Sequence, residues 1–295
     1  MTDQLPIGII DIGSNSVRLV VYDPPYIGQS PYFNEKVQCG LGRDLGQSGR
    51  LHEGAVKSAI KALTGFKALA DAMGLHTLHA VGTAALRDAE DGPAFVERVR
   101  NDIGINIKVI DGTEEARLSA LGVVQNFKNP KGLIGDLGGG SLELAVIRKD
   151  GVRDVLSLQL GVLRVLSAPR KADYIQKQLA QIPQSMLNQP NFYTVGGTWR
   201  ALANIYYKHH GHPYERLMGK KIKADVMSEF ANMIAGMNQS DLMKTYKVED
   251  RRAELMPMAA RILVETLSMV KPKTVIISTS GLRDGVLFEI LKNGG

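Results

Sequence analysis

A chain of 295 residues with 44% hydrophobic and 22% charged residues predicts a globular protein with room for two domains, and no apolar run approaches the roughly 18 residues of a membrane span. The formal charge of +6 favours an anionic partner, but no zinc-finger pattern, RNA-binding signature or basic helix indicates a dedicated nucleic-acid reader. Because Cys39 is the single cysteine and the N-terminus does not resemble a signal peptide, we expect a cytoplasmic protein with no membrane partner.

The first predicted element is a hairpin. Residues 9–20 have the sequence IIDIGSNSVRLV, in which an apolar run ends at an aspartate and a small polar turn leads into β-branched alternation. An amphipathic helix follows over 55–73, where the apolar residues recur with the period of one helical face. The segment AVGTAALRD at 80–88 then passes from an apolar strand through small residues into the start of a helix. Such a turn exposes backbone N–H groups, so it is a candidate anion site.

The next segment supplies two candidate catalytic acids. Pro93 begins a further helix, and IKVID at 107–111 predicts a strand. We expect Thr113 to cap the following helix, with Glu114 and Glu115 in its first turn, where the helix dipole favours acids. Adjacent helical residues point about 100° apart, so only one of the two can face a cleft well. Without further context, both acids also fit a role that only stabilises the helix.

A second hairpin repeats the first after the turn NPKG at 129–132, which we take as the domain boundary. Residues 133–144 have the sequence LIGDLGGGSLEL, and an offset of 125 aligns four identical pairs with the first hairpin: Asp11/Asp136, Gly13/Gly138, Ser16/Ser141 and Leu19/Leu144. One unit that occurs twice predicts two duplicated α/β domains that face each other, over residues 1–128 and 129–295.

Facing hairpins of this kind suit a phosphate chain. A turn of small residues points its N–H groups into one concavity, and glycine lets an anion approach the backbone. The strand-to-helix turns TVGGTWRAL (194–202) and IISTSGLRDG (276–285) add two more candidate anion sites. Three carboxylates, Asp11, Asp136 and Glu143, could hold Mg²⁺ beside phosphoryl oxygens. The sequence contains neither a Walker motif nor a dinucleotide fingerprint.

These motifs in series resemble a known family. Paired D-x-G hairpins bind phosphates in the actin, sugar-kinase and heat-shock-chaperone superfamily. Within it, six segments together look like the exopolyphosphatase/guanosine pentaphosphate phosphohydrolase family: DIGSNSVRLVVYD, GTAALRDA, DGTEEARL, DLGGGSLEL, VGGTWRALA and SGLRDGVL. The resemblance covers essentially the whole chain. It implies an α/β fold of two duplicated actin-like (ribonuclease H-like) domains with an interdomain cleft, in a short form without the C-terminal HD-type domain of longer members.

The resemblance also implies a role for each matching residue. Glu115, directly before Ala-Arg, matches the catalytic glutamate, with Glu114 as its competitor. Asp11, Asp136 and Glu143 match metal-associated carboxylates, with Mg²⁺ or Mn²⁺ as the metal. Contacts with phosphate are implied for residues of both turns and for one arginine: Ser14, Asn15, Ser16, Arg18, Arg87, Gly138, Gly139, Gly140 and Ser141.

The activity implied by the resemblance is Mg²⁺-dependent hydrolysis of terminal phosphoanhydride bonds of inorganic polyphosphate, by a homodimer that releases orthophosphate. Guanosine pentaphosphate is the alternative substrate, and a sugar-kinase-like phosphotransferase or a non-catalytic nucleotide-switched protein are competing hypotheses. The basic stretch KHHGHPYERLMGKKIK at 208–223 predicts a solvated surface, with a track for a polyanion as the alternative. Its three histidines lack the separated ligand pairs of a zinc site.

Overall fold

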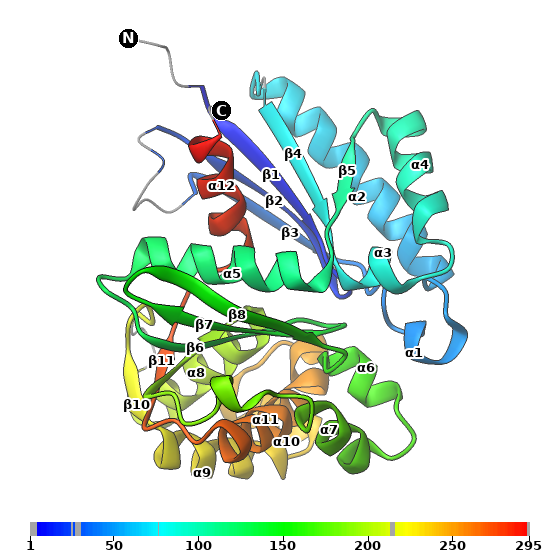
Figure 1. The fold of residues 1–295 in the computed structure, drawn as a ribbon. Coiled ribbons are helices and arrows are strands. Elements are labelled where there is room, and N and C mark those ends of the chain that lie inside the picture. Colours follow the sequence, from blue (N-terminus) through cyan, green and yellow to red (C-terminus); the bar gives the residue numbers. More distant parts are fainter. Residues whose placement is uncertain (1–4, 25, 27–30, 76, 213–215, 294–295) are drawn as a thin grey trace.

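The computed structural model describes residues 5–24, 26, 31–75, 77–212 and 216–293. These residues form two β-sheets of five and six strands, one from each half of the chain, with helices packed on their faces (Figure 1). This arrangement confirms the predicted α/β fold. No helix in the described ranges is both long enough and apolar enough for a membrane crossing.

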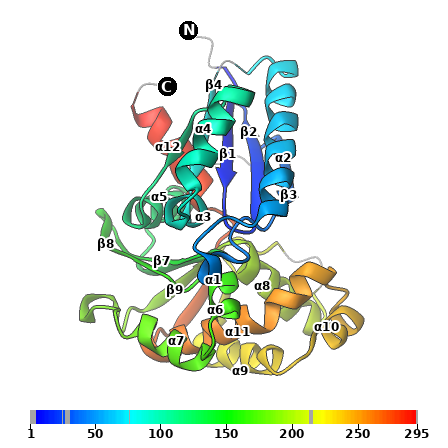
Figure 2. The same cartoon turned by 90° about the vertical axis from the view of Figure 1, so that its right-hand side faces the viewer.

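The first sheet is built around the first predicted hairpin and has the strand order β3-β2-β1-β4-β5. Its first three strands pair antiparallel, whereas β4 and β5 run parallel to β1. Helices α2 and α4 share the apolar core on one face. The last helix of the chain, α12, packs on the other face, so that α2 and α12 lie on opposite sides of the strands (Figure 2). The elements of this half are β1 (Ile7–Ile12), β2 (Ser16–Tyr22), β3 (Phe33–Gln38), α1 (Leu45–Ser48), α2 (Glu53–Ala72), β4 (Thr77–Gly82), α3 (Ala84–Asp88), α4 (Gly92–Ile103) and β5 (Ile107–Val109).

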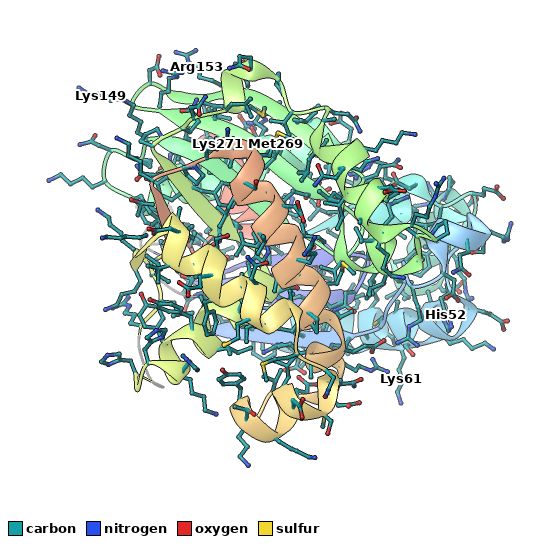
Figure 3. The ribbon with its side chains drawn as sticks, turned by 90° about the horizontal axis from the view of Figure 1, so that it is seen from below. His52, Lys61, Lys149, Arg153, Met269 and Lys271 are labelled. Atoms are coloured by element: carbon teal, nitrogen blue, oxygen red, sulfur yellow. The ribbon has the colours of Figure 1, made fainter. Side chains whose placement is uncertain are left out.

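The second sheet repeats this plan, with the strand order β10-β11-β9-β6-β7-β8. Strands β6, β7 and β8 pair antiparallel, while β9 and β11 run parallel to β6. Helices α9 and α11 lie side by side below this sheet (Figure 3). The elements of this half are β6 (Gly132–Leu137), β7 (Leu142–Arg148), β8 (Gly151–Leu158), α6 (Val162–Ser167), α7 (Lys171–Leu179), a 3₁₀ turn (Gln184–Met186), β9 (Asn191–Val195), α8 (Gly197–His209), β10 (Lys221–Lys223), α9 (Ala224–Ala235), α10 (Gln239–Tyr246), α11 (Asp250–Val270), β11 (Thr274–Ile277) and α12 (Leu282–Lys292).

The two hairpins have matching geometry. The strand register places Asp11 opposite Arg18 in the first hairpin and Asp136 opposite Glu143 in the second. Each turn is closed by a hydrogen bond of 3.0 Å from a glycine amide to a serine carbonyl: Gly13 to Ser16 and Gly138 to Ser141. The duplication predicted from the 125-residue offset is therefore confirmed in the sheets and in the turns.

Helix α5 (Gly112–Asn126) lies between the two sheets and packs against both (Figure 1). Its Leu118 belongs to the apolar core under the first sheet, while Ala120 and Val123 belong to a core on the second sheet. Because both candidate catalytic acids lie in its first turn, α5 fixes them relative to both domains at once.

The N-terminal cap of α5 differs from the prediction. The side chain of Asp111 accepts a hydrogen bond of 2.8 Å from the amide of Glu114, so Asp111 is the capping residue. Thr113 already lies inside the helix, and its hydroxyl donates to the same carboxylate at 2.6 Å. The prediction that Thr113 caps the helix was wrong because a carboxylate two residues earlier already satisfies the free amide.

Helix α12 follows the second sheet in sequence but packs on the first. Its Val286 and Leu287 share an apolar core with Ile7 and Ile9 of β1. The chain therefore returns to its first half after completing the second sheet. The domain limits at residues 1–128 and 129–295 remain a prediction. Helix α12 belongs to the second of these ranges but packs on the sheet of the first.

Candidate active site

A cleft of about 180 Å³ lies between the two halves of the chain. Both hairpin turns line it, with residues 13–16 from the first half and 138–141 from the second. The three strand-to-helix turns that the sequence singled out line it as well, through residues 83–84, 196–198 and 279–283. The structure thus brings all five predicted anion-binding turns to one place.

The glycines of the second turn are needed because the first turn lies against it. A Cβ atom on Gly140 would lie 2.6 Å from Oγ of Ser14, and one on Gly139 would lie 3.1 Å from Cβ of Ser14. The amides of Ser14, Asn15, Gly139 and Gly140 donate to no backbone carbonyl of the described residues. The hydroxyl of Ser14 is buried and also has no hydrogen-bond partner there. Free donors on residues that line a cleft from both sides can form a site for an anion with several oxygens.

Helix geometry separates the two candidate acids. Glu115 is 8% exposed and lines the cleft. Glu114 points elsewhere and forms an ion pair with Arg117, whose Nε donates to Oε2 of Glu114 at 2.7 Å. Glu114 lines a different cavity, between α5 and α12. Of the two predicted catalytic residues, the structure therefore brings only Glu115 to the cleft between the two hairpin turns.

The surroundings of Glu115 suit a proton acceptor at neutral pH. Burial raises the pKa of Glu115 to about 7 because its carboxylate loses hydration, and the negative charges of Asp136 and Asp11 act in the same direction. Arg87 opposes this shift, since its Nη1 donates to Oε2 of Glu115 at 2.9 Å. The guanidinium of Arg87 also donates to the carbonyl O of Ile110 at 3.2 Å, and Arg87 does not line the cleft. Its predicted contact with phosphate stays a prediction.

Two of the three predicted metal-associated carboxylates line the cleft, and the third does not. Asp11 and Asp136 line the cleft, whereas Glu143 is 2% exposed and is absent from its lining. Oε1 of Glu143 accepts a hydrogen bond of 2.9 Å from Oγ of Ser157. Burial, followed by the charge of Glu115, raises the pKa of Glu143 well above its usual range. Glu143 therefore lies behind the wall of the cleft, and a direct metal contact for it stays a prediction.

The remaining two carboxylates fit a divalent cation that shares its ligands with a substrate. Burial raises the pKa of Asp136, and the charge of Asp11 adds to the shift, so a cation between them would relieve their repulsion. Oδ2 of Asp136 accepts a hydrogen bond of 2.7 Å from Oγ of Ser119. Within the described ranges, no group of three or more His, Cys, Asp or Glu side chains is arranged to hold a metal by itself. Mg²⁺ needs only one or two carboxylates when phosphates and water complete its shell.

Basic side chains also line the cleft. Arg18, which the sequence predicted, lines it together with five further cations: Lys36, Arg200, Arg251, Arg252 and Arg283. Burial and the neighbouring arginines lower the pKa of Lys36 to about 8 and that of Arg18 to about 10. Among the residues that the structure describes, only one of these cations forms an ion pair with a carboxylate: Nη1 of Arg283 lies 3.4 Å from Oδ2 of Asp11. Such a concentration of like charge costs free energy unless an anion is bound among the side chains.

Comparison with known proteins decides the family. The model of the Ppx/GppA phosphatase family matches residues 27–294. The chain belongs to this family. A family member from Aquifex aeolicus, 27% identical in sequence, superposes with a TM-score of 0.79 over 99% of both chains.

Two relatives of this chain carry names that describe different activities. Exopolyphosphatase 1 of Mycobacterium leprae is 25% identical over 303 residues, which cover 97% of this chain and 89% of the relative. The guanosine-5'-triphosphate,3'-diphosphate pyrophosphatase of Aliivibrio fischeri is 24% identical over 305 residues, which cover 96% of this chain and 58% of the relative. The chain spans about half the length of several other curated relatives that it matches.

Sequence reasoning missed most cations of this Ppx/GppA cleft, although a signal was present for two of them. Each strand-to-helix turn is followed by an arginine in the first turns of a helix: Arg87 in GTAALR, Arg200 in GGTWR and Arg283 in SGLR. Only Arg87 was singled out, and it is the one of the three that does not line the cleft. Neither Lys36 nor Arg252 follows such a turn, and β3 and α11 meet only in the folded chain.

No described residue of the basic stretch at 208–223 lines the cleft, and residues 213–215 are outside the described ranges. Nζ of Lys208 donates to the carbonyl O of Tyr246 at 2.7 Å. Lys221 and Lys223 are exposed on β10, at the edge of the second sheet, and do not line the cleft. The geometry favours the solvated surface over a polyanion track for the described part of this stretch.

Proposed function

We propose that this Ppx/GppA protein is an exopolyphosphatase that hydrolyses the terminal phosphoanhydride bond of inorganic polyphosphate and releases orthophosphate. The observation that carries the proposal is the convergence of a buried acid, free loop amides and several cations on one cleft. Glu115 supplies a proton acceptor, and the turns at 13–16 and 138–141 supply hydrogen-bond donors for a phosphate. The cations suit a substrate whose charge continues beyond its terminal group. The name of the Mycobacterium leprae relative supports the same activity.

In the proposed reaction, water attacks the terminal phosphorus in line with the leaving chain, and Glu115 orients that water and accepts its proton. A pKa near 7 suits this task, because the carboxylate is then both available and basic at neutral pH. The free amides of the two turns and the hydroxyl of Ser14 donate to phosphate oxygens. Asp11 and Asp136 would hold Mg²⁺, which when bound neutralises charge on phosphoryl oxygens. Transfer to water requires no covalent intermediate.

Guanosine pentaphosphate is the second candidate substrate. The name of the Aliivibrio fischeri relative favours it, and a cleft lined by arginines also suits a nucleotide that carries phosphate groups at two positions. A homodimer remains a prediction, which sedimentation at micromolar concentration would test.

One assay tests the activity and the substrate together. Release of orthophosphate would be measured in parallel from long-chain polyphosphate, guanosine pentaphosphate and ATP, with the wild-type protein and two matched variants. Glu115→Gln should lose at least about 100-fold in turnover on polyphosphate, because only proton acceptance is removed. Glu114→Gln, one residue away and outside the cleft, should retain turnover. If orthophosphate is released from guanosine pentaphosphate but not from polyphosphate, guanosine pentaphosphate is the substrate. Full turnover in Glu115→Gln would refute the role of Glu115 as the base.

A further inference from the structure

A chain of polar contacts behind the cleft joins the second glycine turn to Glu115. Nε of Arg164, on α6 in the second half, donates to the carbonyl O of Gly140 at 3.0 Å, and its Nη2 donates to Oδ2 of Asp88. Oδ1 of Asp88, on α3 in the first half, accepts from Nε of Arg87 at 3.3 Å. Arg87 in turn donates to Oε2 of Glu115 at 2.9 Å. We call these five residues the relay.

The charged groups of the relay are largely shielded from water. The side chains of Arg164, Asp88 and Arg87 are 13%, 19% and 20% exposed. Two arginines face two carboxylates, so the relay is neutral as a set when Glu115 is ionised. In the part of the chain that the structure describes, Asp88 is the sole carboxylate paired with Arg164. Removing one charge from such a shielded network leaves the others unbalanced, which makes single substitutions informative.

We propose that Asp88 and Arg164 are positioning residues that tie the second phosphate turn to Glu115 through Arg87. This inference rests on the base role of Glu115 proposed above. A guanidinium is planar and rigid, so the hydrogen bond from Nε of Arg87 to Asp88 sets the direction of the Nη1 atom that meets Glu115. Arg164 holds the same carboxylate and the backbone of Gly140, and a shift of the phosphate turn is thereby transmitted to the base.

Two features distinguish the relay from an ordinary ion pair between domains. Arg164 contacts the backbone of a residue that lines the phosphate site, and Asp88 contacts the arginine that holds the candidate base. An ion pair that only joined the two halves would need neither contact. The relay therefore predicts a loss in the chemical step that is separate from any loss of stability.

The first test compares two aspartate variants. Asp88→Asn keeps the shape of the side chain but removes its charge, and it should lower kcat on polyphosphate about tenfold while KM changes less than about twofold. The matched control is Asp102→Asn, which removes an exposed ion pair with Arg98 on α4, both side chains being 55% exposed. The control should leave kcat and KM unchanged. Thermal unfolding of each variant would show whether the protein is folded.

The second test places Asp88→Asn in a Glu115→Gln background. If the relay acts through Glu115, Asp88→Asn should cause little further loss of the residual turnover of Glu115→Gln. An equal tenfold loss in the wild-type and Glu115→Gln backgrounds would mean a structural role and would overturn the inference. If Asp88→Asn does not fold, Arg164→Lys is tested in the same two backgrounds and judged in the same way. Its single ammonium group cannot hold both Gly140 and Asp88 as the guanidinium does. Full turnover in Glu115→Gln would refute the proposed base, and the relay with it, whereas wild-type kcat in Asp88→Asn with an impaired Glu115→Gln would refute the relay alone.

Discussion

Gly285 lies where α12 crosses α5, and its replacement by alanine should force the two helices apart. A Cβ atom at this position would lie 1.8 Å from the carbonyl O of Leu118 and 2.6 Å from its carbonyl C. To reach an ordinary contact of 3.4 Å, the backbones would have to separate by about 1.6 Å. Because α5 carries Glu115 in its first turn, such a movement would also reach the cleft.

Two opposing contributions set the size of the effect. Alanine is more favourable than glycine inside a helix by about 1 kcal/mol. Overpacking costs about 1–3 kcal/mol, and Gly285→Ala belongs at the upper end because the opposing atom is a backbone carbonyl that cannot rotate away. We therefore expect a net destabilisation of about 2 kcal/mol. Turnover should fall at least about tenfold, since misplacement of a catalytic group by 1 Å can cost up to about 100-fold.

The matched control is Gly65→Ala in α2. Gly65 is also inside a helix, but a Cβ atom there would have nothing within 4 Å, so helix propensity acts alone. Gly65→Ala should gain about 1 kcal/mol in the free energy of unfolding and keep its turnover. Urea denaturation and phosphate release would be measured on both variants. A gain in stability for Gly285→Ala, similar to that of the control, would show that α5 and α12 do not cross this closely in solution.

Three further outcomes are expected. Glu143→Gln should raise the free energy of unfolding more at pH 8 than at pH 5, because a carboxyl with a raised pKa destabilises the fold increasingly as the pH rises through that pKa; equal gains at both pH values would contradict this. Asp136→Asn should increase the Mg²⁺ concentration that gives half-maximal turnover, and an unchanged metal titration would remove Asp136 from the site. Lys36→Gln should raise KM for long polyphosphate at pH 7, and the effect should be smaller in high salt or above pH 8, where Lys36 loses its charge. Lys221→Gln is the control, and an equal rise of KM in both variants would mean general charge attraction.

The parts of the fold that could be predicted depend on local patterns. The hairpins at 7–22 and 132–148 follow from apolar alternation around a turn of small residues, and their duplication follows from one offset. The resemblance favoured Glu115 over Glu114 and the helix period implied that only one of them faces a cleft, but the sequence left the choice open, and the structure places only Glu115 in the lining. Position within the helix then decides which carboxylate faces the phosphate turns.

The parts that could not be predicted depend on contacts between segments far apart in sequence. Arg252 lies in the first turn of α11 and Lys36 lies on β3, and neither segment contains a motif that brings them together. Arg87 shows the converse: its motif matched a phosphate contact, which stays a prediction, while in the structure its guanidinium donates to Glu115. Residue type and motif indicate that an arginine belongs to the site, but the direction of its side chain is decided by which carboxylates surround it.

The pairing of Arg87 with Glu115 has a consequence for the pH dependence of the reaction. In the free protein, Arg87 stabilises the carboxylate and holds the pKa of Glu115 below the value that burial alone would give. A bound phosphate chain would compete for the guanidinium, as the resemblance implies for Arg87, and the pKa of Glu115 should then rise. The acid limb of kcat/KM reports the free protein and that of kcat reports the complex, so the limb of kcat should lie at higher pH. Both profiles would be measured on polyphosphate between pH 5 and 9 at constant ionic strength. If the limbs coincide in the wild type, Arg87 stays on Glu115 throughout the reaction, and its positive charge acts on the base rather than on the substrate.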